Sequence, residues 1–245
     1  MANDVPMIMH KLASLLEASS LSCRGGFHPS AEDAMPPLSN GGVVGTVVLI
    51  GNIGPQMWHS FRHSPEKLDE NLDTNANPLD RWTKRILEDV ILKVDGFGPV
   101  EALYPFGGPP YLPFQRWAQR AEPVHPSPTG PLIHPTYGLW HAYRGAFVFE
   151  QRLELPPTEC AQSPCDSCGD RPCLNACPVN AFDGTSYDVP ACTAHMLHDP
   201  AGETCQTSGC LARHACPVGK EYTYEPSQSE FHTGAFLRAQ LSDKT

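Results

Sequence analysis

Hydrophobic positions in the first half of the chain follow helical and strand patterns in turn. Residues 7–16 form an apolar helical stretch, and residues 43–50 form a β-branched run bounded by glycines, as in a buried strand. Residues 55–62 predict a short helix. Apolar side chains recur at helical spacing over residues 79–93, directly after an Asn-Pro pair, so the pattern predicts a helix there. Residues 143–155 return to the apolar pattern of a strand.

These elements divide the chain into two predicted domains. Strands and helices together predict an α+β layer domain over residues 1–157. Within it, residues 96–136 are dense in proline and glycine, so long irregular connections are expected. Such a loop in a compact domain either carries function or merely connects elements at the surface. Residues 158–245 predict a second domain that is loop-rich and helical, with a helix over residues 189–197.

The composition narrows the class of protein. Hydrophobic residues make up 40% of the 245 residues, which is enough to fill a core. The formal net charge is −10 and no basic cluster is evident, so nucleic acid is not expected as a partner. The longest apolar stretch, residues 42–51, is about half of what a membrane-spanning helix needs, and residues 1–20 lack the pattern of a secretory signal. We therefore expect a cytoplasmic protein with no membrane partner.

The ten cysteines are distributed unevenly along the chain. Cys23 stands alone in the first 159 residues, and the other nine lie between Cys160 and Cys216. In a reducing compartment such thiols persist as metal ligands or reactive groups rather than as disulfides. Eight of them resemble the spacing of a two-cluster ferredoxin, C-x2-C-x2-C-x3-C-P, with x4 in place of one x2 and a second Cys-Pro at the end.

Eight thiolates are the number that two 4Fe-4S clusters require. In ferredoxins the cysteine before proline reaches the other cluster, and this crossed pattern gives two predicted sets of metal ligands. The first set is Cys165, Cys168, Cys173 and Cys216, and the second is Cys177, Cys192, Cys205 and Cys210. Two alternatives stay open, because paired cysteines also make structural zinc sites and an isolated cysteine such as Cys192 is by default a small buried hydrophobe. Cys23 and Cys160 fall outside the pattern and are expected to be ordinary thiols.

The cysteine segment resembles a known module. From Cys165 to Pro178 it reads Cys-Asp-Ser-Cys-Gly-Asp-Arg-Pro-Cys-Leu-Asn-Ala-Cys-Pro, and it is followed by Cys192, Gly209-Cys210 and Cys216-Pro217. This is similar to the iron-sulfur module of epoxyqueuosine reductases and reductive dehalogenases. Those enzymes pair two 4Fe-4S clusters with a cobalamin that a nitroreductase-like α/β domain holds. The resemblance therefore implies two 4Fe-4S clusters, a cobalamin, a nitroreductase-like fold for residues 1–157 and a ferredoxin-like domain over residues 158–245.

Residues 131–149 carry a second resemblance. They look like the His-Pro-x-Phe-Gly-Gly-Trp-x-Ala-x-Arg-Gly stretch of the cblC-type cobalamin-processing chaperones, with matches at His134, Pro135, Gly138, Trp140, Ala142, Arg144 and Gly145. Two positions depart from that stretch, because Leu139 replaces its second glycine and His141 replaces an aromatic residue. The animal chaperones also have no iron-sulfur tail, so the electron donor is expected to differ.

This second resemblance implies a corrinoid pocket and a functional arginine. Family domains bind cobalamin with its lower base displaced and remove the upper ligand, and Arg144 matches an arginine on the thiol-binding side of the pocket. The resemblance thus implies Arg144 as the catalytic residue. The implied cofactor-binding residues are His134, Tyr137, Gly138, Trp140, Tyr143, Arg144 and Gly145. The aromatic members are equally typical of an ordinary core, and a strand-edge arginine also pairs with an acid; direct ligation of cobalt by His134 or His141 is not expected.

Three functions agree with these patterns. The first is an oxidoreductase that binds a corrinoid, receives electrons from an upstream donor of unknown identity and reductively removes the upper ligand of cobalamin. The second is a ferredoxin-type electron carrier whose first half docks partners. The third is an epoxyqueuosine-reductase-like tRNA-modifying enzyme, which the net charge of −10 disfavours. We expect the first function, because it accounts for both resemblances.

Overall fold

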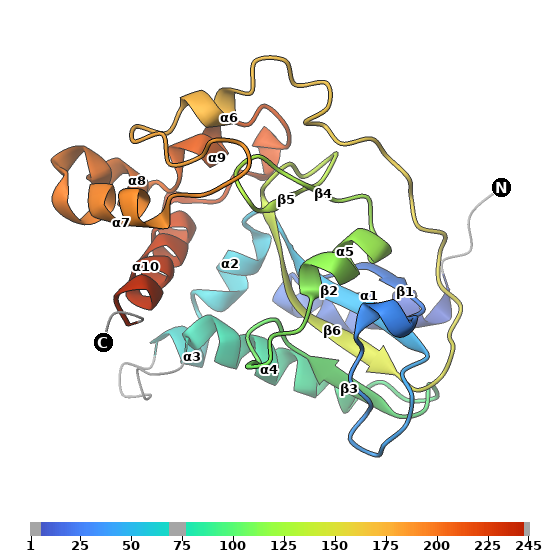
Figure 1. The fold of residues 1–245 in the computed structure, drawn as a ribbon. Helices are drawn as coiled ribbons and strands as arrows, with labels where there is room; N and C mark the ends of the chain where they lie inside the picture. The colour runs from blue at the N-terminus through green and yellow to red at the C-terminus, as the bar shows by residue number, and fades with distance from the viewer. Residues whose placement is uncertain (1–5, 69–76, 243–245) are drawn as a thin grey trace. The chain divides into compact units, whose positions relative to one another are not determined.

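The computed structural model describes residues 6–68 and 77–242 (Figure 1). The chain divides into two compact units, which we treat separately. Unit 1 comprises Met1–Pro123 and His141–Cys160, and unit 2 comprises Val124–Trp140 and Ala161–Thr245. The sequence predicted one change of domain after residue 157, whereas the chain also enters unit 2 for Val124–Trp140 and then returns. A pattern along the chain does not reveal this return, because pairing between distant segments decides it.

Unit 1 is built on a four-stranded antiparallel sheet with the order β1-β2-β6-β3. The strands are β1 (Ser22–Phe27), β2 (Thr46–Ile53), β3 (Val100–Leu103) and β6 (His141–Phe149), and they lie side by side in Figure 1. Thr46 lies opposite Phe149 and Ile53 opposite His141, so β2 and β6 pair over their whole length. All residues of β2 except Ile53 are buried, which explains the continuous apolar run in its sequence.

Among the described residues of unit 1, four α-helices contact this sheet and a fifth packs against one of the four. The four are α1 (Met7–Leu16), α2 (Gln56–Phe61), α4 (Pro78–Ile91) and α5 (Phe114–Ala121), and the fifth is α3 (Pro65–Leu68), which packs against α4. The helices predicted over residues 7–16, 55–62 and 79–93 are therefore confirmed. The start of α4 has the expected cause, because the Asn77 side chain accepts a hydrogen bond from the Leu79 amide at 3.0 Å and Pro78 occupies the first turn.

The structure corrects the prediction of long loops over residues 96–136. Strand β3 and helix α5 both lie in this range. Phe114, Trp117, Ala118 and Ala121 of α5 are buried, and their spacing is helical. This signal was present in the sequence, but the surrounding prolines and glycines obscured it. The predicted strands also shift, since β2 ends at Ile53 and β6 ends at Phe149, because their mutual pairing sets the ends.

Unit 2 consists of short elements joined by loops. It contains β4 (His125–Pro126), β5 (Leu132–Ile133), α6 (Pro172–Asn175), α7 (Val189–His198), α8 (Glu203–Thr207), α9 (Leu211–Ala215) and α10 (Pro226–Ser242). The helix predicted over residues 189–197 is confirmed as α7. Helices with an antiparallel sheet confirm the α+β class. In the described part of the chain, no helix is long and apolar enough to span a membrane.

Candidate functional site

The eight cysteines of the ferredoxin-like pattern line two cavities in unit 2, four to each. One cavity, of about 210 Å³, is lined by Cys177, Cys192, Cys205 and Cys210, and we call it the Cys177 cavity. The other, of about 240 Å³, is lined by Cys165, Cys168, Cys173 and Cys216, and we call it the Cys165 cavity. The structure therefore brings together the members of each predicted set.

Two short helices explain why the sets cross along the sequence. Cys173 lies in α6 and lines the Cys165 cavity, while Cys177 follows the end of α6 and lines the Cys177 cavity. Helix α9 repeats the arrangement, because Cys210 directly precedes it and Cys216 directly follows it. The two helices pack against each other. Each helix thus contributes one cysteine to each cavity.

The pKa values of thiols in both cavities are raised. Burial is the main cause that raises the pKa of Cys165, Cys173 and Cys216 in one cavity. Burial likewise raises the pKa values of the second set, namely those of Cys192, Cys205 and Cys210. Neighbouring thiols of the same set raise these pKa values further, as Cys216 does for Cys165. Metal binding at either cavity must therefore displace thiol protons.

Zinc was the alternative metal for these cysteines. A tetrahedral zinc site requires sulfur atoms about 2.3 Å from a single ion. Within residues 6–68 and 77–242, no three side chains of His, Cys, Asp or Glu form a group that could hold one metal ion. The two cavities thus gather thiols without forming a single-ion site among the described residues.

Aromatic side chains surround the Cys177 cavity. Trp140 lines it, is 1% exposed, and its Nε1 atom has no hydrogen-bond partner among the described residues. The Arg213 guanidinium lies 4.5 Å from the ring centre of Trp140 and 4.4 Å from that of Tyr224. Tyr187 also lines this cavity, and its hydroxyl hydrogen-bonds to the thiol of Cys192. Trp140, predicted from the resemblance as a corrinoid residue, therefore lies at a cysteine cavity.

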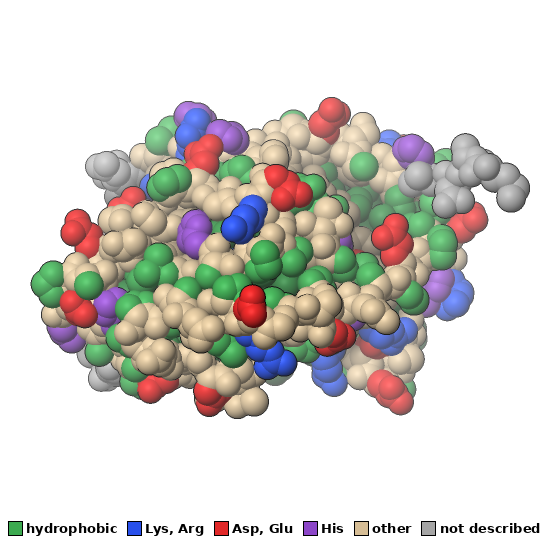
Figure 2. Space-filling model, turned by 90° about the horizontal axis from the view of Figure 1, so that it is seen from above, with side chains coloured by type: hydrophobic (Ala, Val, Ile, Leu, Met, Phe, Trp, Pro, Cys, Tyr) green, Lys and Arg blue, Asp and Glu red, His purple; other side chains and the backbone are tan. Residues whose placement is uncertain are grey.

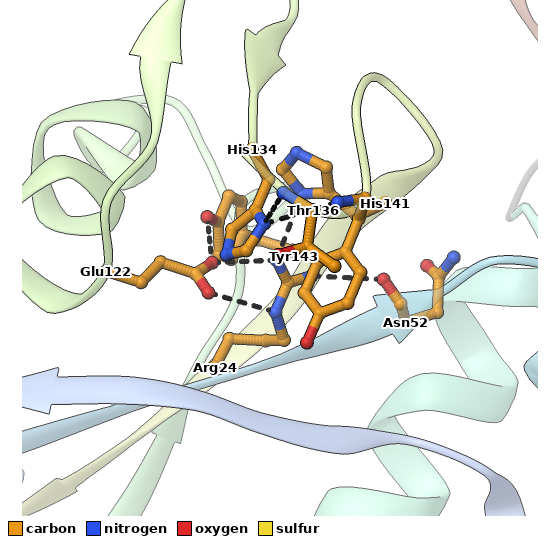
Figure 3. A network of polar contacts seen from close by, with 8 residues as sticks. Arg24, Asn52, Glu122, His134, Thr136, His141 and Tyr143 are labelled. Atoms are coloured by element: carbon orange, nitrogen blue, oxygen red, sulfur yellow. Dashed lines mark hydrogen bonds and ion pairs between the residues drawn. The ribbon is translucent and has the colours of Figure 1, made fainter. Parts of the chain in front are cut away.

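The other predicted residues of unit 2 shape a turn. His134 Nδ1 accepts hydrogen bonds from the amides of Thr136 at 3.0 Å and Tyr137 at 3.3 Å, and Figure 3 shows the His134 ring beside Thr136. The rings of His134 and Tyr137 stack with centroids 4.2 Å apart. Gly138 has φ +58°, and a Cβ atom there would lie 2.0 Å from the Val218 carbonyl oxygen. These contacts give the segment a structural role in unit 2.

The predicted residues of unit 1 also have partners within their unit. Arg144 Nη2 lies 2.6 Å from Asp80 Oδ1 and donates to Thr83 Oγ1 at 3.2 Å. A Cβ atom at Gly145 would lie 2.5 Å from Leu87 Cδ1, so a side chain there would displace the Leu87 side chain of α4. Arg144 therefore forms the ion pair with an acid that was the structural alternative for this residue.

Unit 1 holds a buried polar network that sequence reasoning missed (Figure 3). Arg24, only 2% exposed, forms an ion pair with Glu122 at 2.8 Å and donates to the Asn52 carbonyl oxygen at 3.1 Å. The Tyr143 hydroxyl donates to Glu122, and His141 Nδ1 lies 3.3 Å from Arg24 Nη2. Burial raises the pKa of Glu122, against the opposing effect of Arg24. Since Arg24 and Glu122 are 98 residues apart, no local motif marks this network.

Comparison with known proteins shows a likeness in fold. No family model matches the chain, and no curated protein matches it in sequence. Among solved structures, it is similar to epoxyqueuosine reductase from Streptococcus thermophilus, with 16% identity, a TM-score of 0.50 and coverage of 91% of this chain and 70% of that chain. It is also similar to CblC, a B12-trafficking protein of C. elegans, with 17% identity, a TM-score of 0.51 and coverage of 92% and 88%. The fold is thus shared with both proteins.

A third similar structure bears on nucleic acid as a partner. It is an epoxyqueuosine reductase with an epoxyqueuosine-modified tRNA stem loop, at 14% identity, a TM-score of 0.51 and coverage of 89% of this chain and 66% of that chain. The comparisons therefore do not support the expectation that this chain has no nucleic-acid partner. On the face that Figure 2 shows, the described acidic and basic side chains are interspersed.

Proposed function

We propose that this chain is an iron-sulfur redox protein that binds a corrinoid and delivers electrons to it, so that the upper axial ligand of cobalamin is removed reductively. One observation carries the proposal: eight cysteines line two cavities, four to each. The fold shared with an epoxyqueuosine reductase and with a B12-trafficking protein supports a redox or corrinoid-related role.

The side chains of the two cavities suit 4Fe-4S clusters. Each cavity offers the four thiols that one such cluster uses. In the Cys177 cavity, the buried Nε1–H of Trp140 has no partner, and a sulfur atom of a bound cluster would accept its hydrogen bond. The Tyr187 hydroxyl already donates to the Cys192 sulfur. When bound, the clusters supply one-electron transfer, and hydrogen bonds to their sulfurs adjust the potential.

The corrinoid side of the proposal rests on the second resemblance. Cobalamin, when bound, supplies the cobalt-centred removal of the upper ligand. The residues that this resemblance predicts are Tyr143, Arg144 and Gly145, which belong to unit 1, and His134, Tyr137, Gly138 and Trp140, which belong to unit 2. Tyr143 belongs to the buried network of Arg24 and Glu122, which fixes its hydroxyl. The ion pair with Asp80 holds the Arg144 guanidinium in one orientation, so Arg144 would offer the corrinoid a preoriented cation.

The metal content tests the cluster half of the proposal. Protein reconstituted anaerobically should hold about eight iron and eight acid-labile sulfide per chain. Cys216→Ser and Cys205→Ser should each remove about four of both, because each variant removes one ligand from one cavity. Cys160→Ser is the matched control, since this exposed thiol lines neither cavity. Stoichiometric zinc without sulfide would contradict the proposal.

Ligand titration tests the corrinoid half. Cobalamin should bind with a stoichiometry near one per chain, and Arg144→Ala should weaken binding or ligand removal without changing the iron content. No binding up to about 100 μM, far above the ~1 μM that corresponds to about −8 kcal/mol, would leave the electron carrier as the function. If Arg144→Ala has no effect on either property, the role of Arg144 is its ion pair with Asp80.

The tRNA-modifying function is the second candidate, because a structure of similar fold contains a tRNA stem loop. The formal charge of −10 opposes binding to a polyphosphate. Binding of a tRNA stem loop should therefore be undetectable at about 150 mM salt, where affinity depends on neutralised phosphates. Micromolar binding under these conditions would favour the tRNA function instead.

A further inference from the structure

A buried histidine lies at the Cys177 cavity and belongs to neither predicted ligand set. His195 lines this cavity and is 6% exposed. It lies on α7, three residues after Cys192. Residues three apart on a helix share a face, so His195 and Cys192 follow one another along the same side of α7.

The partner of one ring nitrogen fixes the tautomer of His195. Nδ1 lies 3.0 Å from Asp199 Oδ2. The amide of Ala201 donates to Asp199, and this bond together with His195 lowers the pKa of that carboxyl. An ionised carboxylate only accepts hydrogen bonds, so Nδ1 of His195 carries the proton. The neutral ring therefore has its lone pair on Nε2.

The other ring nitrogen is buried without a partner. Nε2 of His195 has no hydrogen-bond partner among the described residues. A histidine that donates through Nδ1 to a carboxylate and leaves Nε2 bare is the arrangement found where histidine ligates a metal ion, because the carboxylate fixes the ring and raises its basicity. In this cavity, the metal that Nε2 would bind is iron held by the surrounding thiolates.

We propose that Nε2 of His195 can take the place of the Cys192 thiolate as an iron ligand at the Cys177 cavity, an inference that rests on the proposed function. Cys192 is the thiol that His195 most readily replaces, because both lie on one face of α7. Cys192 also has another partner in the Tyr187 hydroxyl. The cavity thus offers five donors for the four positions of one cluster.

Exchange of these ligands would change the charge of the cluster. A neutral imidazole replaces an anionic thiolate, so the bound cluster becomes less negative by one charge. Replacing cysteine by histidine ligands raises the reduction potential of iron-sulfur centres. The exchange would therefore raise the reduction potential of the cluster in the Cys177 cavity relative to that of the cluster in the Cys165 cavity.

The experiment compares iron, sulfide and nitrogen coupling in four proteins labelled with ¹⁵N-histidine. They are the wild type, Cys192→Ser, Cys192→Ser/His195→Ala and Cys205→Ser, each reconstituted anaerobically. Cys192→Ser should keep about eight iron and, after reduction, show the magnetic coupling of a directly bound nitrogen. The double variant should lose about four iron and that coupling. Cys205→Ser is the control, because it has no histidine three residues away, and it should also lose about four iron.

Each other outcome decides against the inference. Loss of four or more iron in Cys192→Ser would overturn it, because a substitute ligand implies that this variant keeps its cluster. Eight iron without nitrogen coupling would overturn the inference as well, because the cluster would then be retained without His195 as a ligand. A wild type with no iron or sulfide would instead overturn the proposed function itself, so the two failures are distinguishable.

Discussion

Replacing Glu122 with glutamine should destabilise unit 1 by about 3–5 kcal/mol, the usual cost of removing one partner of a buried ion pair. The pair is well buried, since the side chain of Arg24 is 1% exposed and that of Glu122 is 11% exposed. Arg24 cannot relieve the loss by giving up its proton, because guanidinium remains charged at any accessible pH. Neutral groups such as the Asn52 carbonyl oxygen would then face a buried cation without its counter-charge. A fall of about 6–20 °C in the melting temperature should follow.

Arg24→Met should behave differently with pH. Here the remaining group is Glu122, whose pKa burial already raises above its usual range. Without Arg24 that pKa rises further, so the folded state binds a proton more tightly than the unfolded state. The stability of Arg24→Met should therefore fall as the pH rises above the usual pKa of a glutamate, about 4.5. The stability of Glu122→Gln should lack this pH dependence, because glutamine does not titrate.

Urea unfolding followed by tryptophan fluorescence measures these effects. Trp58, Trp82 and Trp117 are buried in unit 1, so three of the four tryptophans report on it. Lys11→Met is the control, because its ion pair with Asp95 is exposed and should contribute little to stability. A cost of Glu122→Gln no larger than that of Lys11→Met would refute the reasoning.

Three further predictions concern single residues. Burial raises the pKa of Cys23 to about 12, so from about pH 9 upward the unfolding free energy of the wild type should fall by about 1.4 kcal/mol per pH unit more than that of Cys23→Ala. Gly138→Ala should speed iron loss to a chelator, because its Cβ would meet the Val218 carbonyl; Gly130→Ala, with φ +98° and no atom within 4 Å, should do so less. Trp140→Phe should make the potential of one cluster more negative in a redox titration, because it removes an N–H donor.

Elements with a clear apolar period could be predicted from the sequence. Helix α1 lies at Met7–Leu16, the range of its apolar stretch, and α7 differs from its prediction by one residue. Strand β3 was missed, because its four residues are only half-buried and carry little apolar pattern. The ends of β2 and β6 depend on pairing between residues about a hundred positions apart, which no local pattern records.

The candidate site was likewise predicted only in part from the sequence. The two sets of cysteines follow from spacing, because α6 and α9 are short enough for the two cysteines at each helix to fall into different cavities. His195 was missed because histidine on an apolar helix has no distinctive spacing, and its significance depends on where Nε2 is buried. Two assignments remain predictions: iron for the eight cysteines, and a corrinoid for the His134–Gly145 segment.

Single-turnover electron transfer tests the central claim most directly. The reconstituted protein is reduced anaerobically, freed of reductant and mixed with one equivalent of hydroxocobalamin, and the visible spectrum is followed. Each 4Fe-4S cluster gives up one electron, so cobalt(III) should be reduced to cobalt(II) as one cluster is reoxidised. With two equivalents of hydroxocobalamin, Cys216→Ser, which lacks a ligand of the Cys165 cavity, should reduce about one cobalt per chain where the wild type reduces about two. An unchanged cobalamin spectrum beside clusters that stay reduced would contradict the account.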